Sequence, residues 1–206
     1  MKLAVFDFDS TLMDGETIDF LAVPLGIEDK VAEITSRAMA GELDFFESLT
    51  TRVALLKGLP KERVEEICSS LPMMRGAMEV VAGLKERGYK VICFSGGFRT
   101  ATTPASKRLG IDADFSNILH DENGILTGKV GGDMMFGFSK GDMIVRLQNL
   151  LGIGRENTLV VGDGANDLSM FEHADIRVAF CAKPILKEEA THCVDTKDLR
   201  EILKIV

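Results

Sequence analysis

The chain has 206 residues, which is enough for one domain with a small insertion and for a hydrophobic core of its own. Hydrophobic residues make up 46% and charged residues 27%, a globular composition that excludes a disordered chain. The formal net charge of −8 argues against binding to nucleic acid or to an anionic membrane. Charged residues interrupt every apolar run too soon for a transmembrane helix or a signal peptide, so we expect a cytoplasmic protein.

The first apolar run, residues 3–6, predicts a strand that leads into Asp7-Phe8-Asp9-Ser10-Thr11. Residues i and i+2 of a strand point the same way, so the carboxylates of Asp7 and Asp9 are expected side by side. The carboxyl ends of the strands are where open α/β sheets bind ligands. Two carboxylates this close repel each other unless a cation lies between them or one is protonated, so the motif indicates a chemical site.

The next interval, residues 13–72, shows no strand pattern. Apolar stripes at helical spacing predict three helices there, within residues 31–38, 45–56 and 64–71. A crossover between parallel strands needs only about a dozen residues, so an interval this long indicates a small helical cap inserted after the first strand. We therefore expect a core formed by residues 1–12 and 73–206 and a cap formed by residues 13–72.

A helical pattern at residues 77–87, closed by Gly88, leads to a second apolar run at residues 91–94. This predicted strand is followed by Ser95-Gly96-Gly97 and by a helix expected to begin near Phe98. Glycine allows close approach to the backbone, and the N–H groups at a helix start attract phosphate. Together with the carboxylates of the first strand, this turn favours a phosphate site.

The sequence Asn123-Gly124 within residues 117–135 is typical of a hairpin, and we expect a two-stranded antiparallel flap there. Lys140 then precedes a helical pattern at residues 141–151. A single lysine is usually a solvated surface residue. A phosphate site that contains several carboxylates needs a cation, however, and Lys140 can supply it.

The apolar run at residues 158–161 predicts a strand that again ends in acid, in the sequence Gly162-Asp163-Gly164-Ala165-Asn166-Asp167. Oxygen ligands of this kind suit a hard cation such as Mg²⁺, and the acidic pattern of an EF-hand calcium loop is absent. Two more strands are predicted at residues 177–180 and 192–194. The alternation of strands and helices predicts a doubly wound, Rossmann-like α/β fold with a parallel sheet, a helical cap and a β-hairpin flap.

The order of these segments resembles the motif set of the haloacid dehalogenase superfamily of phosphotransferases. Residues 7–11 are similar to its first motif, Ser95 to its second, Lys140 to its third and residues 162–167 to its fourth. The joint match is specific, although each motif alone is not. The stretches around Glu16 and Arg52 and at residues 94–98 and 162–182 narrow the resemblance to the superfamily's phosphatases for O-phospho-L-serine, over nearly the whole chain.

This resemblance implies a covalent mechanism. Asp7 is the expected nucleophile, which forms an aspartyl-phosphate, and Asp9 is the expected general acid and base. The phosphoryl oxygens are then held by Ser95, Gly96 and Lys140. The implied cofactor is Mg²⁺, bound by Asp7, the backbone carbonyl of Asp9 and Asp163, with Asp167 in contact with it directly or through water.

The cap is expected to select the substrate. The resemblance assigns Glu16 to the substrate ammonium and Arg52 to its carboxylate, for which a guanidinium offers a planar fork. It also implies that Met39 and Phe45 close over the substrate and that Asn166 contributes to substrate or water binding. Residues 131–138 depart from the family, because they are rich in Met and Phe where the family is usually more polar.

The implied activity is the Mg²⁺-dependent hydrolysis of O-phospho-L-serine in L-serine biosynthesis. Another small phosphomonoester, such as phosphohomoserine, remains an alternative substrate. An alternative of a different class is a phosphate-accepting signalling module similar to a receiver domain, which also uses a strand-end Asp, Mg²⁺ and a Lys. A receiver has no helical cap and no use for a general acid. We expect no nucleic-acid or membrane partner, and either a monomer or a homodimer.

Overall fold

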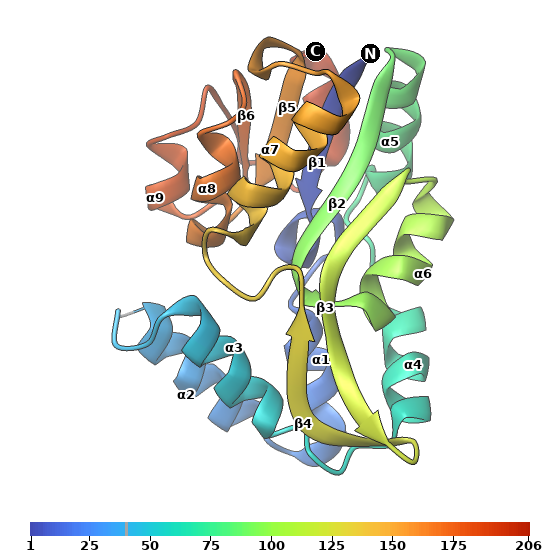
Figure 1. The fold of residues 1–206 in the computed structure, drawn as a ribbon, viewed down its shortest axis with the longest axis vertical. Coiled ribbons are helices and arrows are strands. Elements are labelled where there is room, and N and C mark those ends of the chain that lie inside the picture. The colour runs from blue at the N-terminus through green and yellow to red at the C-terminus, as the bar shows by residue number, and fades with distance from the viewer. Residues whose placement is uncertain (40) are drawn as a thin grey trace.

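The computed structural model describes residues 1–39 and 41–206 and is built on one seven-stranded sheet (Figure 1). The strand order is β4-β3-β2-β1-β5-β6-β7, and all neighbours are parallel except β3 and β4. The strands are β1 (Lys2–Asp7), β2 (Tyr89–Phe98), β3 (Ala113–Glu122), β4 (Ile125–Gly132), β5 (Thr158–Gly162), β6 (Ile176–Phe180) and β7 (His192–Val194). This confirms the predicted parallel sheet, and it makes β1 the central strand at which the order of connection reverses.

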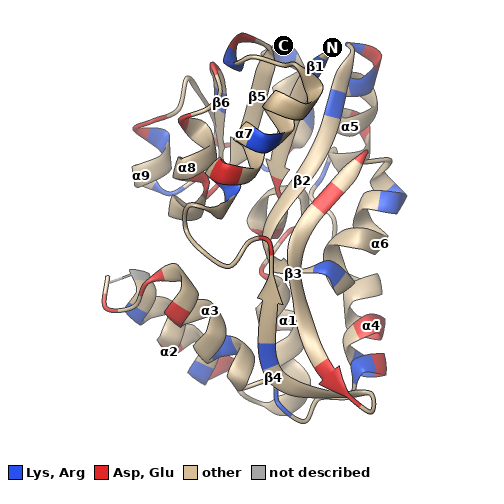
Figure 2. Cartoon of the chain, in the orientation of Figure 1, with Lys and Arg blue, Asp and Glu red and all other residues tan. Residues whose placement is uncertain are grey.

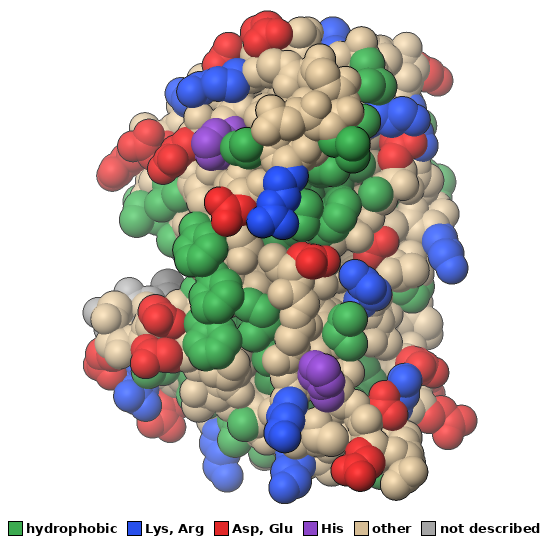
Figure 3. Space-filling model, viewed as in Figure 1, with side chains coloured by type: hydrophobic (Ala, Val, Ile, Leu, Met, Phe, Trp, Pro, Cys, Tyr) green, Lys and Arg blue, Asp and Glu red, His purple; other side chains and the backbone are tan. Residues whose placement is uncertain are grey.

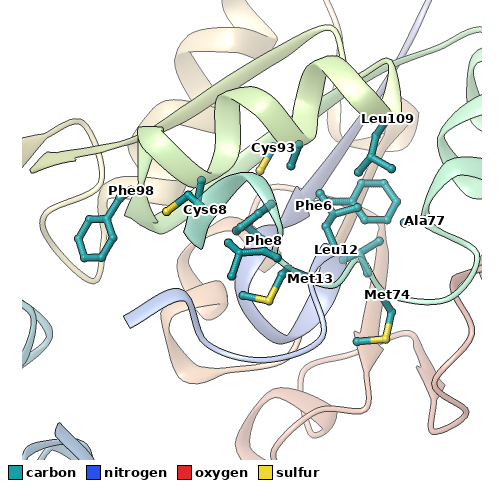
Figure 4. Packing of buried hydrophobic residues seen from close by; sticks show 14 of the residues in the cluster. Phe6, Phe8, Leu12, Met13, Cys68, Met74, Ala77, Cys93, Phe98 and Leu109 are labelled. Carbon is teal, nitrogen blue, oxygen red and sulfur yellow. The ribbon is translucent and has the colours of Figure 1, made fainter. Parts of the chain in front are cut away.

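Both faces of the sheet are buried, and β1 shows why. Its alternate residues enter two hydrophobic clusters, with Ala4 and Phe6 in one and Leu3 and Val5 in the other. Figure 4 shows part of the first cluster, including Phe6, Leu12 and Leu109. Because each fully buried large side chain contributes about 1.5–3 kcal/mol, two such layers favour a central strand that is apolar throughout.

Helices cover the two faces separately (Figure 1). Helices α5 and α6 contribute to the cluster of Phe6, and α7, α8 and α9 contribute to the cluster of Val5. Their bounds are α5 (Ala77–Glu86), α6 (Arg99–Leu109), α7 (Ser139–Leu151), α8 (Leu168–Phe171) and α9 (Pro184–Lys187). Helices α6 and α7 end at Gly110 and Gly152, which adopt the left-handed conformation that glycine tolerates. Their N–H groups donate to carbonyls in the last turn of each helix.

In the interval predicted as the cap, the described residues form four α-helices, one more than the three predicted: α1 (Thr17–Ala22), α2 (Glu28–Met39), α3 (Phe45–Ala54) and α4 (Lys61–Ser69). Helix α2 packs between α1 and α3, while α4 packs against α6 of the core. Asp44 and Glu47 form a capping box at the start of α3. The side chain of Asp44 accepts from Glu47 N, and the side chain of Glu47 accepts from Asp44 N. The predicted boundaries between core and cap, at residues 12 and 72, stay a prediction. Helix α4 contacts both α1 of the cap and α6 of the core.

The β3–β4 hairpin connects the core to the segment between α3 and α4. Leu126 of β4 accepts from Gly58 N and donates to the Leu59 carbonyl, both at 2.9 Å. Lys61 N donates to the Gly124 carbonyl at 2.9 Å, and its Nζ lies 2.8 Å from Asp121 Oδ1. The outer edge of β4 is therefore paired where it passes the cap, and the C-terminal end of α3 rests on it.

The hairpin differs from the expected flap in one respect. Its first strand begins at Ala113 and pairs in parallel with β2 before it leaves the core, so the flap is an extension of the main sheet. The sequence did not predict this strand because Asp114 interrupts its apolar pattern. That carboxylate accepts hydrogen bonds from Thr102 and Thr103 of α6 at 2.7 and 2.9 Å, which compensates for its position in the sheet.

Charged side chains are spread over the elements of the cap and the core (Figure 2). Among the helices of the described residues, none combines the length and the apolar character that crossing a membrane requires.

Candidate active site

A cavity of about 820 Å³ lies between the carboxyl end of the sheet and the cap. Its wall combines three regions that are remote in sequence: the turn after β1, the helices α1 to α3, and the end of β2 with the loops after β5 and β6. Residues that line it include Asp9, Glu16, Arg52, Gly96, Asp163 and Lys183. The sheet's switch point and the cap therefore enclose one site.

A buried lysine lies between two carboxylates at the end of β1. Lys140 Nζ, in the first turn of α7, lies 2.7 Å from Asp7 Oδ1 and 2.6 Å from Asp167 Oδ1. All three residues are buried. Burial and the nearby Asp167 raise the pKa of Asp7 well above its usual range, against the opposing effect of Lys140. Burial alone would lower the pKa of Lys140, but Asp167 and Asp7 outweigh it and raise that pKa.

Three carboxylates converge beside this lysine. Asp7, Asp163 and Asp167 each offer an oxygen, and these oxygens lie within 4.8 Å of one another. Asp167 also accepts from the backbone N–H groups of Asp163 and Gly164 at 3.0 and 3.1 Å. Burial and Asp167 raise the pKa of Asp163 to about 7. One lysine does not balance three carboxylates, so the site fits a hard divalent cation with oxygen ligands.

Asp9 lies outside this triad. The strand ends at Asp7, and Asp9 belongs to the turn Phe8–Leu12, so strand alternation does not determine its direction. Its Oδ1 accepts from the Thr17 amide and hydroxyl at 2.7 and 2.6 Å, and Ser95 Oγ lies 3.4 Å from Oδ2. Burial raises the pKa of Asp9, while the Thr17 hydrogen bonds lower it. Asp7 and Asp9 therefore occupy distinct environments.

The end of β2, where the register with β3 shifts after Phe94, is held tightly around Ser95. Its buried hydroxyl accepts from Gly97 N at 2.9 Å. A Cβ on Gly97 would lie 2.7 Å from Asp9 Oδ2, so only glycine leaves room for that carboxylate. The carbonyl of Gly96 accepts from the Asn117 amide at 3.0 Å. The Gly96 and Gly97 backbone lines the cavity, while Ser95 itself is fully buried. We call residues 95–97 the phosphate loop, since a glycine backbone just before a helix is typical of a phosphate site.

The two charged cap residues predicted from the sequence face the same cavity. Ser10, in the left-handed conformation with φ of 58°, donates from Oγ to Glu16 Oε1 at 2.7 Å. Desolvation in the cavity wall and then Asp9 raise the pKa of Glu16 to about 8, although the cavity leaves this side chain open to solvent. Burial lowers the pKa of Arg52, while Glu16 and Asp19 raise it.

Phe45 touches the phosphate loop from the cap side. A Cβ on Gly96 would lie 2.6 Å from the Phe45 ring, so this ring rests on the loop where a larger residue would displace it. Asn166 also lines the cavity, opposite the cap helices. Met39 ends α2, and its side chain lies outside the described residues.

Several residues of the site were not predicted from the sequence. Thr17 orients Asp9, Ser10 orients Glu16, and Asn117 fixes the loop at Gly96. Lys183 and Asp19 add one positive and one negative side chain to the cavity wall. Thr17 directly follows Glu16 and lies eight residues after Asp9, so its nearness in sequence was a usable signal. The others act on partners that only the folded chain brings near.

The acidic triad predicts a pH-dependent stability in EDTA. The pKa of Asp163 is about 7 in the folded chain and 3.8 without perturbation, so the folded state holds more protons between these values. The free energy of unfolding should therefore fall as pH rises from about 4 to about 7, by at most about 1.4 kcal/mol per pH unit for one group. We expect a shallower decline of Tm with pH in Asp163→Asn.

The control is Asp175→Asn, which alters an exposed carboxylate near Arg155. Its Tm should follow the wild type at every pH. A divalent cation should raise the wild-type Tm more at pH 7.5 than at pH 5, because protons compete with it at low pH. Parallel Tm curves for the wild type and Asp163→Asn would contradict the prediction.

Comparison with known proteins places this geometry in a family. The model of the haloacid dehalogenase-like hydrolases matches residues 1–175. The phosphoserine phosphatase of Wolinella succinogenes is 63% identical over 203 residues, which cover 98% of each chain.

Two solved structures are similar over the whole chain. A phospho-aspartyl intermediate analogue of phosphoserine phosphatase has a TM-score of 0.95 at 48% identity, and the match covers 100% of this chain and 98% of the other. A substrate-bound phosphoserine phosphatase complex has a TM-score of 0.94 at 47% identity, with the same coverage of both chains.

Proposed function

The chain belongs to the haloacid dehalogenase-like hydrolases and, among them, to the phosphoserine phosphatases, and on this premise we propose that it hydrolyses O-phospho-L-serine to L-serine and phosphate. One observation supports this most directly. The buried Asp7–Lys140 pair and the acidic triad stand at one side of a cavity whose cap side carries Glu16 and Arg52. Membership in a hydrolase family excludes the receiver-like alternative.

In the proposed first step, an oxygen of Asp7 attacks phosphorus and the bond from phosphorus to the serine oxygen breaks. Asp9 donates its proton to the departing serine oxygen, so L-serine leaves as the neutral alcohol. The phosphoryl group is then an aspartyl-phosphate on Asp7. The raised pKa of Asp9 supports this role, because the acid must be protonated when substrate is bound.

In the second step, Asp9 accepts a proton from water as the water oxygen attacks phosphorus. The bond from phosphorus to the Asp7 oxygen breaks, and phosphate leaves with Asp7 restored. Lys140, the Ser95 hydroxyl and the Gly96 amide hold the phosphoryl oxygens through both steps. One solved relative is described as a phospho-aspartyl intermediate analogue, which supports this route.

We assign Mg²⁺ to the acidic triad, with Asp7 and Asp163 as carboxylate ligands and the backbone carbonyl of Asp9 as a third. Asp167 already accepts from Lys140 and from two backbone N–H groups, so we assign it to a water on the ion. When bound, the ion neutralises charge on the phosphoryl oxygens. Lys140 would add a second positive charge beside Asp7.

The cap residues are proposed to recognise the amino acid. Arg52 can bind the substrate carboxylate through two parallel hydrogen bonds, and Glu16 can bind the ammonium group. An ammonium group beside Glu16 favours the ionised form of this carboxylate. It therefore opposes the effect of desolvation and Asp9, which raise the pKa of Glu16. Phe45 closes the apolar side of the site against Gly96. Met39 is proposed to share this role.

The test is phosphate release from a panel of phosphomonoesters, with Mg²⁺ and with EDTA. The panel contains L- and D-phosphoserine, phosphothreonine, phosphohomoserine, phosphoethanolamine and a sugar phosphate. We expect L-phosphoserine to lead in kcat/KM by about tenfold or more, which corresponds to about 1.4 kcal/mol in the transition state, and EDTA to abolish release. A higher kcat/KM for phosphohomoserine than for L-phosphoserine would show that phosphohomoserine is the preferred substrate.

Arg52→Met provides the matched comparison, because phosphoethanolamine has the ammonium but no carboxylate. We expect kcat/KM for L-phosphoserine to fall by roughly 10- to 100-fold, as for a lost charged hydrogen bond, with little change for phosphoethanolamine. An equal loss for both esters would show that Arg52 does not bind the carboxylate.

A further inference from the structure

Three phenylalanine rings form a stack on the outside of the molecule. Phe46 and Phe136 have ring centroids 5.2 Å apart with planes 12° from parallel, and Phe136 and Phe138 are 5.3 Å apart and parallel. The residues are 39%, 46% and 59% exposed. Figure 3 shows hydrophobic side chains gathered on this face between the cap and the core. We refer to Phe46, Phe136 and Phe138 as the aromatic bridge.

The aromatic bridge joins two parts of the chain that are about 90 residues apart in sequence. Phe46 lies on α3 of the cap, while Phe136 and Phe138 lie in the segment before α7. This segment is the Met- and Phe-rich stretch whose composition departs from the family. Isolated exposed apolar side chains are ordinary, but rings stacked in sequence across two parts of a fold bring those parts together.

On the core side, hydrogen bonds fix the segment that carries Phe136 and Phe138. Phe136 N donates to Ser139 Oγ at 3.1 Å, and the Gly137 carbonyl accepts from Ser169 Oγ at 2.9 Å. The same Ser169 hydroxyl accepts from Gly141 N at 3.2 Å. The two rings are thus held to α7 and α8 close to Lys140.

On the cap side the bridge is adjacent to the cavity. Phe46 follows Phe45, and both lie in the first turn of α3, which the Asp44–Glu47 capping box holds. Phe45 points into the cavity and rests on Gly96, whereas Phe46 lies outside and stacks on Phe136. A movement that separates Phe46 from Phe136 therefore also lifts Phe45 from the phosphate loop.

The two ends of α3 are held in different ways. Near its C-terminal end, a Cβ on Gly128 of β4 would lie 3.1 Å from the Ala54 carbonyl, and the following segment is hydrogen-bonded to β4. At its N-terminal end α3 meets the core through Phe45 and Phe46. Figure 1 shows this end of α3 beside the loop that precedes α7. Among the described residues, no side-chain hydrogen bond or ion pair joins residues 44–47 to the core, so the rings are the contacts that opening at this end must break.

We propose that the aromatic bridge is a latch whose three rings are positioning residues for the reaction. It holds the N-terminal end of α3 against the core and so keeps Phe45 on Gly96 while a phosphate ester is bound. The inference rests on the proposed function only in that the cavity is the reaction site. A stacked aromatic pair is worth about two- to tenfold in an equilibrium, so the contact between Phe46 and Phe136 shifts closure by that factor, and Phe138 supports the Phe136 ring.

The kinetic test uses Phe46→Ala and Phe136→Ala with L-phosphoserine and Mg²⁺. We expect each to raise KM about three- to tenfold with kcat unchanged or higher, because the closed state is lost more readily. The double variant should match the single ones, since either change breaks the same contact. Phe46→Trp should retain the wild-type KM. Leu150→Ala, at an exposed leucine on α7, is the matched control and should leave KM unchanged.

A second readout does not depend on the substrate. The chain has no Trp, so Phe46→Trp adds a single fluorophore to the bridge. Inorganic phosphate with Mg²⁺ should shift the Trp emission to shorter wavelength, as for a ring less exposed to water. Adding Phe136→Ala should raise the Kd for phosphate about three- to tenfold. Unchanged KM and unchanged phosphate Kd in the alanine variants would overturn the latch, and so would additive effects. A different leading ester would instead revise the proposed function and leave the fluorescence test valid.

Discussion

Replacement of Asp7 by Asn is expected to lower kcat for phosphate release by about 10⁴-fold or more. Asp7 is the buried carboxylate at the end of the central strand, and the amide that replaces it is a poor nucleophile of almost the same shape. Lys140 would retain its contact with Asp167, so the fold of the site should persist. Rapid acid quench of the wild type with labelled substrate should trap a phosphorylated protein, which Asp7→Asn should not form.

A matched control for this variant is Asp14→Asn, which alters an exposed carboxylate paired with Lys197. It should retain wild-type kcat and phosphorylation. A comparable loss in Asp14→Asn, or phosphorylation of Asp7→Asn at the wild-type level, would assign the nucleophile elsewhere.

Replacement of Asp9 by Asn is expected to lower kcat for L-phosphoserine by about 10²- to 10⁴-fold, the usual contribution of a general acid or base. The size of the loss should depend on the leaving group. Serine must leave with a proton, whereas p-nitrophenolate leaves as a stable anion. With p-nitrophenyl phosphate, the first step should therefore be much less impaired than the second.

This difference has a distinctive kinetic signature. Asp9→Asn should release about one equivalent of p-nitrophenolate per protein in a burst and then turn over slowly, while phosphate stays on Asp7. Stopped-flow absorbance measures the burst, and acid quench measures the phosphorylated protein. Equal losses with both esters and no burst would show that Asp9 does not act as acid and base in separate steps. Thr17→Val, which removes one hydrogen bond to Asp9, should give a smaller loss of the same kind.

The central chemistry could be predicted because each of its residues follows an apolar run. Asp7 ends β1, Asp163 directly follows β5, and Ser95 directly follows the apolar run 91–94 within β2. Parallel neighbours carry their carboxyl ends to one edge, so three local patterns are sufficient to place three remote side chains together. Lys140 had no such local signal and was identified only through the order of the motifs.

Other features depend on contacts that no local pattern encodes. Asn117 of β3 bonds to Gly96 of the neighbouring strand β2, and Phe46 of the cap stacks on Phe136 of the core. The beginning of β3 was missed for a related reason, since Asp114 is polar by sequence but satisfied by α6. In each case the residue type is unremarkable alone, and its partner lies far along the chain.

The central place of β1 also constrains how the protein is made. β1 pairs with β2 at Tyr89 and with β5 at Thr158, so its second neighbour is synthesised more than 150 residues after it. At roughly 5–20 residues per second, the nascent strand waits roughly 8–30 s with an unpaired apolar edge. Conditions that slow translation before β5 should therefore favour aggregation of the nascent chain, even though the finished protein buries β1 on both faces.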